Sequence, residues 1–267
     1  MSLRLTILGC GSSGGVPRVG PNGWGKCDPS EPRNRRRRCA ILVEREGPGG
    51  TTRLLVDAGP DLREQLLDAG VEKLDALALT HAHADHIHGL DDVRPLVIVN
   101  RKRIQTWMDA ATSEKVRQGF GYLLETPPGS NYPPLLIENR LTPGETVATH
   151  GLGGEIAMTP FRVRHGEIDA LGLRFGAVAY TPDLIDAPPE SLPFLEGLDL
   201  WIVDALRHAP HPSHFTVAQA LEWIARMKPR RAVLTNLHTD LDYRALAAEL
   251  PAGVEPAYDG MTLEFEP

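Results

Sequence analysis

The stretch that decides the fold runs from Thr80 to Gly89 and is THAHADHIHG. Four of its side chains are common metal ligands at close spacing: His81, His83, Asp85 and His86. Ala76 to Leu79, directly before the stretch, is a short apolar run of the kind that forms a buried strand. We therefore expect these side chains to lie at the carboxyl end of a strand, where a loop begins.

The spacing within this stretch separates two ligand pairs. His81 and His83 project to the same side of an extended segment, so both imidazoles can hold one ion at roughly 2.0 to 2.1 Å. Asp85 and His86 follow where the chain must already be turning, which suits a second, adjacent ion. A lone histidine is more often a core or surface residue, but this unit after a strand favours metal binding.

HxHxDH at a strand end resembles the first signature of the metallo-β-lactamase fold superfamily of metal-dependent hydrolases. The resemblance implies an α/β (α+β) fold, a four-layer αβ/βα sandwich with two mixed sheets flanked by helices. We expect residues 1–267 to form one hydrolase domain of this kind. The resemblance also implies the ligands: His81, His83 and His165 on one metal, Asp85, His86 and His238 on the other, and Asp183 bridging both.

The later ligands have a consistent sequence context. His165 stands just past an apolar strand in VRHG, Asp183 follows one in AYTPD, and His238 follows one in TNLHTD. Side chains gathered from several strand ends converge at one edge of a sheet. We expect two divalent cations, Zn²⁺ or Mn²⁺, because imidazole and carboxylate ligands suit both. A cation pair can share a hydroxide that attacks a phosphoryl centre.

The leaving oxygen needs a proton, which suits a histidine with a pKa near neutral. His214, in SHFT before a predicted helix, matches a non-ligand histidine of the phosphodiesterase branches, and the resemblance makes it the general acid. His208 and His211 are weaker candidates. We therefore expect His214, Asp85 and His208 as the catalytic set, with Asp204 orienting His214.

Two segments are candidates for substrate binding. GCGSSGGVP, Gly9 to Pro17, follows a predicted strand and fits neither the Walker A nor the dinucleotide pattern, yet its glycines allow backbone N–H groups to approach an anion. Arg33 and Arg35 to Arg38 form a basic run whose guanidinium groups suit phosphate, although such a run is commonly a solvated edge. The predicted substrate contacts are Gly11, Ser12, Ser13, Gly14 and Arg37.

The opening GCGSSGGVPR, the WGKC segment, the run ending in RRC and PSHFT together resemble the PhnP-type branch of cyclic phosphate phosphodiesterases. That branch carries clustered cysteines for a structural zinc. Here only Cys27 stands in the early segment, and position 241 is Leu241, so we expect no third metal. The resemblance implies a dinuclear phosphodiesterase for a small diester, a cyclic ribosyl phosphate or a nucleotide.

Three alternatives remain open. A tRNA 3′-end endonuclease uses the same site, but it usually needs a long basic arm that this sequence lacks. A thioester or lactam hydrolase could use the same metals, although His214 and the arginines favour phosphate. A catalytically dead scaffold would not need the intact ligand set.

Composition sets the remaining bounds. The 267 residues are 42% hydrophobic and 24% charged, an ordinary globular composition. A net charge of −7 argues against a stable nucleic-acid partner. No apolar run approaches the length of a membrane span, and three cysteines are too few for a disulfide framework, so we expect a cytoplasmic protein without a membrane partner. A homodimer stays open, as do the native metal and the pathway.

Overall fold

The computed structural model describes residues 2–265 and consists of two seven-stranded mixed sheets. The strands of the first sheet, in spatial order, are β14 (Met261–Phe265), β1 (Leu3–Gly9), β2 (Ala40–Gly47), β3 (Gly50–Val56), β4 (Ala76–Ala78), β5 (Ile104–Met108) and β6 (Leu136–Arg140). Those of the second are β13 (Val254–Pro256), β12 (Arg231–Thr235), β11 (Leu200–Asp204), β10 (Val178–Thr181), β9 (Ile168–Phe175), β8 (Gly154–His165) and β7 (Val147–Gly151).

Each sheet is antiparallel in one half and parallel in the other. β1, β2 and β3 are antiparallel: a long irregular segment joins β1 to β2, and a hairpin joins β2 to β3. β3 to β6 are parallel and their connections carry helices, as parallel neighbours require. In the second sheet β7 to β10 are antiparallel, and β10 to β13 are parallel. The carboxyl ends of the parallel strands therefore meet at shared edges, which is where loops can build a site.

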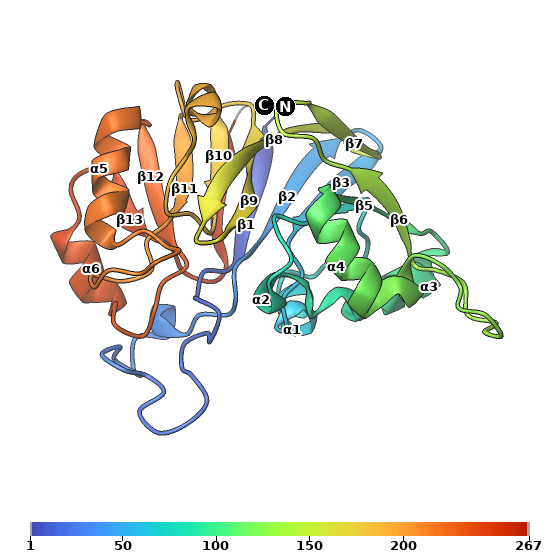
Figure 1. Ribbon diagram of the computed structural model, residues 1–267, viewed down its shortest axis with the longest axis horizontal. Helices are drawn as coiled ribbons and strands as arrows, with labels where there is room; N and C mark the ends of the chain where they lie inside the picture. Colours follow the sequence, from blue (N-terminus) through green and yellow to red (C-terminus); the bar gives the residue numbers. More distant parts are fainter. Residues whose placement is uncertain (1, 266–267) are drawn as a thin grey trace.

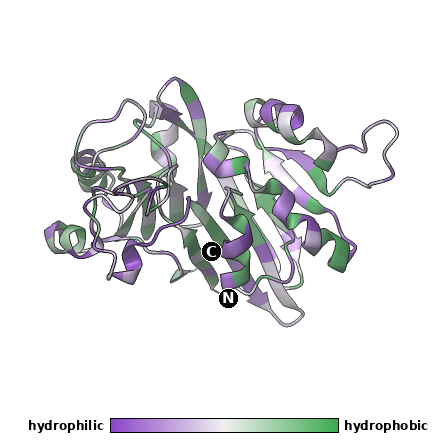
Figure 2. Ribbon diagram, turned by 90° about the horizontal axis from the view of Figure 1, so that it is seen from below, coloured by the Kyte–Doolittle hydropathy of each residue, from purple (hydrophilic) through white to green (hydrophobic). Residues whose placement is uncertain are grey.

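The two sheets face each other across a common apolar core. Leu5 and Val56 of the first sheet and Leu173, Tyr180 and Ile202 of the second belong to one cluster of buried side chains. Burial of each large aliphatic side chain contributes about 1.5–3 kcal/mol. Figure 2 shows the hydrophobic residues concentrated on the strands, with hydrophilic ones frequent along the surrounding loops.

Helices cover the outer face of each sheet (Figure 1). The helices beside the first sheet are α1 (Leu62–Asp68), α2 (Ala84–Ile87), α3 (Arg94–Asn100) and α4 (Ala110–Phe120), and those beside the second are α5 (Val217–Met227) and α6 (Tyr243–Glu249). The short 3₁₀ helices are η1 (Pro32–Asn34), η2 (Leu90–Val93), η3 (Gly121–Leu123) and η4 (Pro189–Phe194). The result is the predicted four-layer sandwich.

Helix α5 shows how local sequence sets an element. Thr216 accepts a hydrogen bond from the backbone N–H of Gln219, whose side chain accepts one from the Thr216 backbone, so the helix begins with a capping box. Val217 and Ala220 are buried against the second sheet. The helix ends at Lys228, which adopts a left-handed conformation.

The predicted fold class is confirmed. The strand expected at Ala76 to Leu79 is β4, and the helix expected after His214 is α5. Elements α2, α3, β6 and β13 were not predicted. In the described part of the chain no helix combines the length and apolar character needed to cross a bilayer. The expectation of a single domain over 1–267 stays a prediction, and it agrees with a core shared by both sheets.

Candidate metal centre and active site

The candidate site lies where strand ends from both sheets meet. The loop after β4 supplies the HxHxDH stretch, and His165 is the last residue of β8. Asp183 follows β10, Asp204 ends β11, and the loop after β12 supplies Asn236 and His238. Backbone pairing joins the two sheets here, because Leu171 of β9 donates to the Thr80 carbonyl at 2.9 Å.

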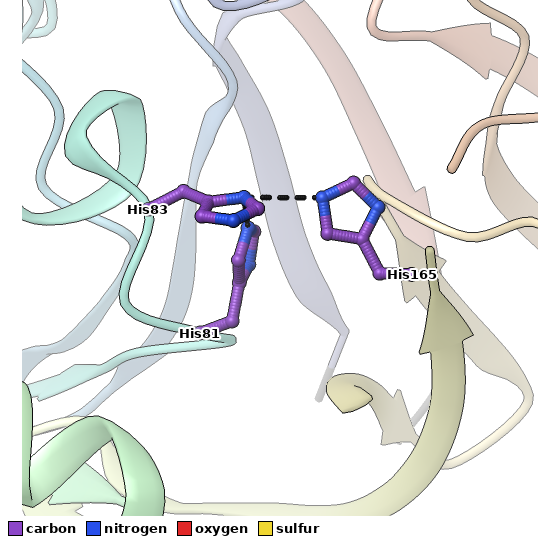
Figure 3. Close-up of side chains that lie close together, drawn as sticks. All are labelled: His81, His83 and His165. Atoms are coloured by element: carbon purple, nitrogen blue, oxygen red, sulfur yellow. Dashed lines mark hydrogen bonds between the residues drawn. The ribbon is translucent and has the colours of Figure 1, made fainter. Parts of the chain in front are cut away.

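Three histidines converge with their ring nitrogens facing one another (Figure 3). His83 Nδ1 lies 3.0 Å from His81 Nε2 and 3.1 Å from His165 Nε2. His165 donates its Nδ1 proton to the Ser213 carbonyl at 2.8 Å, so its Nε2 presents a lone pair to the centre. Two nitrogens bound to one tetrahedral zinc lie about 3.3 Å apart, close to the separations found here.

A second group is built around His86 and Asp183. Buried Asp57 accepts from Thr80 N at 2.8 Å and from His86 Nδ1 at 2.8 Å, which leaves His86 Nε2 facing Asp183 Oδ2 at 2.9 Å. A carboxylate that accepts from Nδ1 in this way fixes the orientation of the imidazole ring. Asp85 Oδ2 lies 3.5 Å from His86 Nε2.

These donors fit divalent cations. Asp183 Oδ2 is buried and has no hydrogen-bond partner among the described residues, although it faces an imidazole nitrogen. Burial alone would raise the pKa of Asp183, but His86, His81 and His214 hold it well below its usual range. Burial acts to lower the pKa of His86, but Asp183 and Asp57 in turn outweigh it and raise that pKa. An ionised carboxylate oxygen opposite an imidazole nitrogen that gives up its proton when a metal binds is the arrangement that a cation between them would satisfy.

His214 has a partner of its own. Its Nδ1 lies 2.8 Å from Asp204 Oδ2 and 3.3 Å from Asp183 Oδ1. Burial acts to lower the pKa of His214, yet Asp204 and Asp183 outweigh it and raise the pKa to about 9. Asn236 fixes both carboxylates, since its side-chain amide donates to Asp183 Oδ1 at 3.0 Å and to Asp204 Oδ1 at 3.1 Å. His214 is therefore held by Asp204 and protonated at neutral pH.

One cavity of about 330 Å³ connects these groups. Its lining residues include Ser12, Ser13, Arg18, His83, Asp85, His165, Asp183, Arg207, His211, His214, Asn236 and His238. Arg18 Nη2 donates to Ser12 Oγ at 3.3 Å, and Arg18 Nε is buried without a hydrogen-bond partner among the described residues. Two guanidinium groups therefore face the same space as the metal donors, which suits an anionic substrate.

His238 is less closely joined to the other predicted ligands. It lines the cavity, but it belongs to none of the described groups of three donors whose ligand atoms lie within 4.8 Å of one another. Its Nδ1 accepts from Asp240 N at 3.2 Å. His214, by contrast, forms such a group with His165 and Asp183.

Four of the predicted catalytic and substrate-binding residues lie outside the cavity lining: Gly11, Gly14, Arg37 and His208. Gly11 donates its N–H to the Arg37 carbonyl at 2.7 Å, and a Cβ on Gly14 would meet the Arg18 side chain at 2.8 Å. These glycines serve close packing of the loop, and Ser12 and Ser13 between them reach the cavity. Arg37 lines a different cleft, where its Nη2 pairs with Asp68 at 2.5 Å. The assignment of Arg37 as a contact in this site is therefore corrected.

His208 is also displaced from its predicted place. Its side chain is 56% exposed and lies 3.3 Å from Glu249 of α6, outside the cavity lining. Sequence reasoning missed Arg18, Arg207 and Asn236. Each has only a weak sequence signal: Arg18 follows the glycine-rich opening, Arg207 precedes His208, and Asn236 stands two residues before His238.

The chain belongs to the β-lactamase superfamily, because the Beta-lactamase superfamily domain matches residues 52–236. With its sheets, layers and histidine–aspartate cluster, it is a metallo-β-lactamase fold hydrolase. A crystal structure of a new diphosphatase from the PhnP family is similar over 99% of this chain and 98% of that chain, at 35% identity and a TM-score of 0.86. The predicted resemblance is confirmed.

Curated relatives match as well. An octanoyltransferase from Porphyromonas gingivalis is 31% identical over 264 residues, which cover 97% of this chain and 51% of the relative. A ribonuclease Z from Bradyrhizobium sp. is 30% identical over 151 residues, covering 55% of this chain and 46% of the relative. The chain thus spans about half the length of the octanoyltransferase, and its match to the ribonuclease Z covers slightly less than half of that relative.

Proposed function

We propose that this hydrolase is a metal-dependent phosphodiesterase for a small phosphate diester. The observation that carries the proposal is the composition of one cavity. It combines converging histidine and aspartate donors with a non-ligand His214–Asp204 pair and two arginines, Arg18 and Arg207. A thioester offers no anionic oxygen for the arginines, whereas a phosphodiester does.

We assign His81, His83 and His165 to one divalent ion, and Asp85, His86 and His238 to a second, with Asp183 between them. When bound, the cations supply Lewis acidity and water activation. The residues of the chain divide the remaining work. Arg18, Arg207 and Ser12 bind non-bridging phosphate oxygens, and Asp57 and the Ser213 carbonyl fix the tautomers of His86 and His165.

His214 has the geometry of a general acid. Asp204 accepts from its Nδ1, which leaves the Nε2–H as the proton available to a leaving oxygen. Asp204 and Asn236 hold the ring and the adjacent Asp183 in fixed relation. This arrangement favours substrates whose leaving group, an alkoxide or a phosphate, needs a proton. It gives less advantage to substrates whose leaving group departs without one.

Two substrate types compete. The residues that line the cavity suit a cyclic ribosyl phosphate or a nucleotide. The similar PhnP-family structure is described as a diphosphatase, which favours a diphosphate linkage as well. Precursor tRNA is a second candidate, because ribonuclease Z relatives match. Against precursor tRNA, the segment from His165 to His238 forms β9 to β12, η4 and α5. These elements belong to the second sheet and its covering helices and not to the long arm that a tRNA endonuclease usually needs.

A substrate panel tests the proposal. Protein loaded with Mn²⁺ or Zn²⁺ is assayed with 2′,3′-cyclic nucleotides, 1,2-cyclic ribosyl phosphate, bis-p-nitrophenyl phosphate, a dinucleotide diphosphate, precursor tRNA and a thioester. We expect turnover of at least one small diester or diphosphate, and kcat/KM for the thioester at least 100-fold lower than for the best phosphate substrate. Preference for the thioester would contradict the proposal. Location in the cytoplasm and a homodimer stay predictions.

A further inference from the structure

A second cavity, of about 800 Å³, opens on the other side of the metal donors. We call it the α4 pocket, because the first turn of α4 forms one wall, at Ala110 and Ala111. Leu141, after β6, and Ile168 and Leu171 of β9 form others. His83 lines both this pocket and the 330 Å³ cavity, so a substrate held at the metal donors can reach into both.

Backbone hydrogen bonds fix the pocket to the metal loop. Leu171 N donates to the Thr80 carbonyl, directly before His81, at 2.9 Å. Leu141 N donates to the carbonyl of Met108, the last residue of β5, at 2.9 Å. The walls therefore belong to the sheets, and their distance from the metal donors is set by strand pairing.

The walls of the pocket expose apolar side chains to solvent. Ala110 and Ala111 are exposed, and Ile168 is 41% exposed although it is a strand residue. Two arginines on the rim are paired, Arg162 with Asp169 at 2.6 Å and Arg140 with Glu138 at 3.2 Å. Asp109 caps α4 by accepting from Thr112 N, and Lys115 is an exposed cation at the rim. The apolar walls between these side chains favour an uncharged, apolar group.

The wall chemistry also distinguishes between apolar groups. No Phe, Tyr or Trp is among the described residues that line the pocket. A base or aryl ring gains much of its affinity by stacking on such rings. Aliphatic walls offer dispersion and burial without a stacking surface, which an alkyl chain uses fully.

We propose that the α4 pocket binds an aliphatic arm of the substrate. This arm is an alkyl group esterified to the phosphate, and the reaction cleaves the other ester bond of the same phosphate. The proposal rests on the proposed phosphodiesterase function and specifies its substrate class: a diester with one aliphatic, non-leaving arm. Ile168 and the first turn of α4 then set specificity, whereas Arg18 and Arg207 line the 330 Å³ cavity.

Methyl, butyl, hexyl and phenyl p-nitrophenyl phosphates test the proposal with the metal-loaded protein. Each methylene that enters an apolar pocket raises kcat/KM by up to about fourfold. We expect kcat/KM to rise from methyl through butyl to hexyl and to exceed the value for phenyl. A flat series, or a preference for phenyl, would overturn the aliphatic assignment while leaving phosphodiester hydrolysis in place.

Variants locate the effect. Ala111→Trp fills the pocket from an exposed helix position, so the rise in kcat/KM from methyl to hexyl should disappear. Ile168→Thr keeps a β-branched strand residue and should reduce the rise. Ala225→Trp, at an exposed position of α5 outside both cavities, is the matched control and should retain the wild-type series.

The outcomes are separable. A chain-length series that survives Ala111→Trp unchanged would show that the arm binds elsewhere and would overturn the inference. A wild-type protein that hydrolyses none of the four esters would overturn the proposed function and, with it, this inference.

Discussion

His214 is the residue on which the proposed chemistry depends most. Its side chain is held by Asp204, it does not complete the assigned ligand set, and it faces the same cavity as Arg18 and Arg207. An acid at this position matters in proportion to the basicity of the leaving oxygen. Its removal should therefore change turnover without changing metal content.

We predict that His214→Ala lowers kcat about 10²- to 10⁴-fold for a dialkyl or diphosphate substrate and much less for bis-p-nitrophenyl phosphate, whose leaving group needs no proton. Steady-state kinetics and elemental analysis of metal check both parts. His208→Ala is the control, since exposed His208 pairs with Glu249 outside the cavity, and its kcat should stay within twofold. Loss of metal in His214→Ala would show that this histidine is a ligand.

Asp57 permits a test of ligand orientation. It accepts hydrogen bonds from Thr80 and His86 and has a positive φ of 65°, which asparagine tolerates. We predict that Asp57→Asn keeps the fold but weakens metal affinity about 10- to 100-fold, because one carboxylate oxygen becomes an amide that cannot accept. Competition with a metal-sensitive dye measures the metal affinity.

Asp68→Asn, at an exposed carboxylate, is the control and should retain the wild-type metal affinity. Equal metal affinity in Asp57→Asn and Asp68→Asn would contradict the role of Asp57.

At the residue scale the sequence predicts ligands better than substrate contacts. His81, His165 and Asp183 follow apolar strands, so their convergence follows from sheet geometry. Arg37 and Arg18 are both arginines near the glycine-rich opening, yet only Arg18 reaches the cavity. Which arginine turns inward depends on the path of an irregular loop, and no periodicity encodes that path.

The element with the least regular structure is the segment between β1 and β2. Buried Arg36 anchors it: Nη1 donates to the His238 carbonyl at 3.3 Å and Nη2 to Asn34 Oδ1 at 3.2 Å. Asn34 in turn donates to Asp242 at 2.6 Å, and Cys27 Sγ lies 3.4 Å from the Leu241 carbonyl. The segment is thus tied to the loop of His238 by hydrogen bonds among these described residues.

We predict that Arg36→Met lowers the free energy of unfolding by about 1–3 kcal/mol, because buried partners lose a charged donor. It should also weaken metal binding, since the His238 carbonyl is no longer held. Arg35→Met, at the exposed neighbouring position, should change the free energy of unfolding by less than about 0.5 kcal/mol. Urea unfolding of both variants measures the difference, and equal stabilities would contradict the anchoring role.

Elements with strong periodicity were predicted from the sequence, as the helix after His214, α5, illustrates. Helix α3 was missed because its sequence, RPLVIVN, is rich in β-branched residues and carries a proline. Strands β6 and β13 are short edge elements whose pairing is decided by their neighbours, β5 and β12. Tertiary context, which a local pattern does not contain, places all three.

At the scale of the whole molecule, Asp259 joins distant parts of the chain. It accepts hydrogen bonds from Cys10 N at 3.1 Å and from Arg37 N at 2.8 Å. Burial raises the pKa of this half-buried carboxyl to about 7, against about 3.9 in an unfolded chain. Its protonated form therefore stabilises the fold fully below pH about 4, and this contribution is lost as pH rises through 7.

We predict that the free energy of unfolding of the wild type, relative to Asp259→Asn, falls between pH 5 and pH 8. The asparagine stays neutral over the whole range, so the difference between the two proteins isolates the titration of Asp259. Denaturant unfolding in the presence of chelator, at several pH values, measures it. A difference that is constant or that grows with pH would contradict the raised pKa.

The fold as a whole was predictable because one signature identifies the family, and its layers follow from strand and helix patterns. The substrate contacts were predicted less accurately. His83 lines two cavities, and only the three-dimensional arrangement reveals the second of them. His83 belongs to the proposed metal centre, where residues from position 81 to 238 meet. We propose that these residues hold divalent cations and that the cations make the protein a phosphodiesterase.

The most direct test titrates metal-free protein with Mn²⁺ or Zn²⁺ while hydrolysis of bis-p-nitrophenyl phosphate is followed. We predict a negligible rate without metal, a rise that ends near two equivalents per chain, and no rise in Asp183→Ala. Undiminished hydrolysis by the chelated protein, or a fully loaded protein that hydrolyses no phosphodiester, would contradict this proposal.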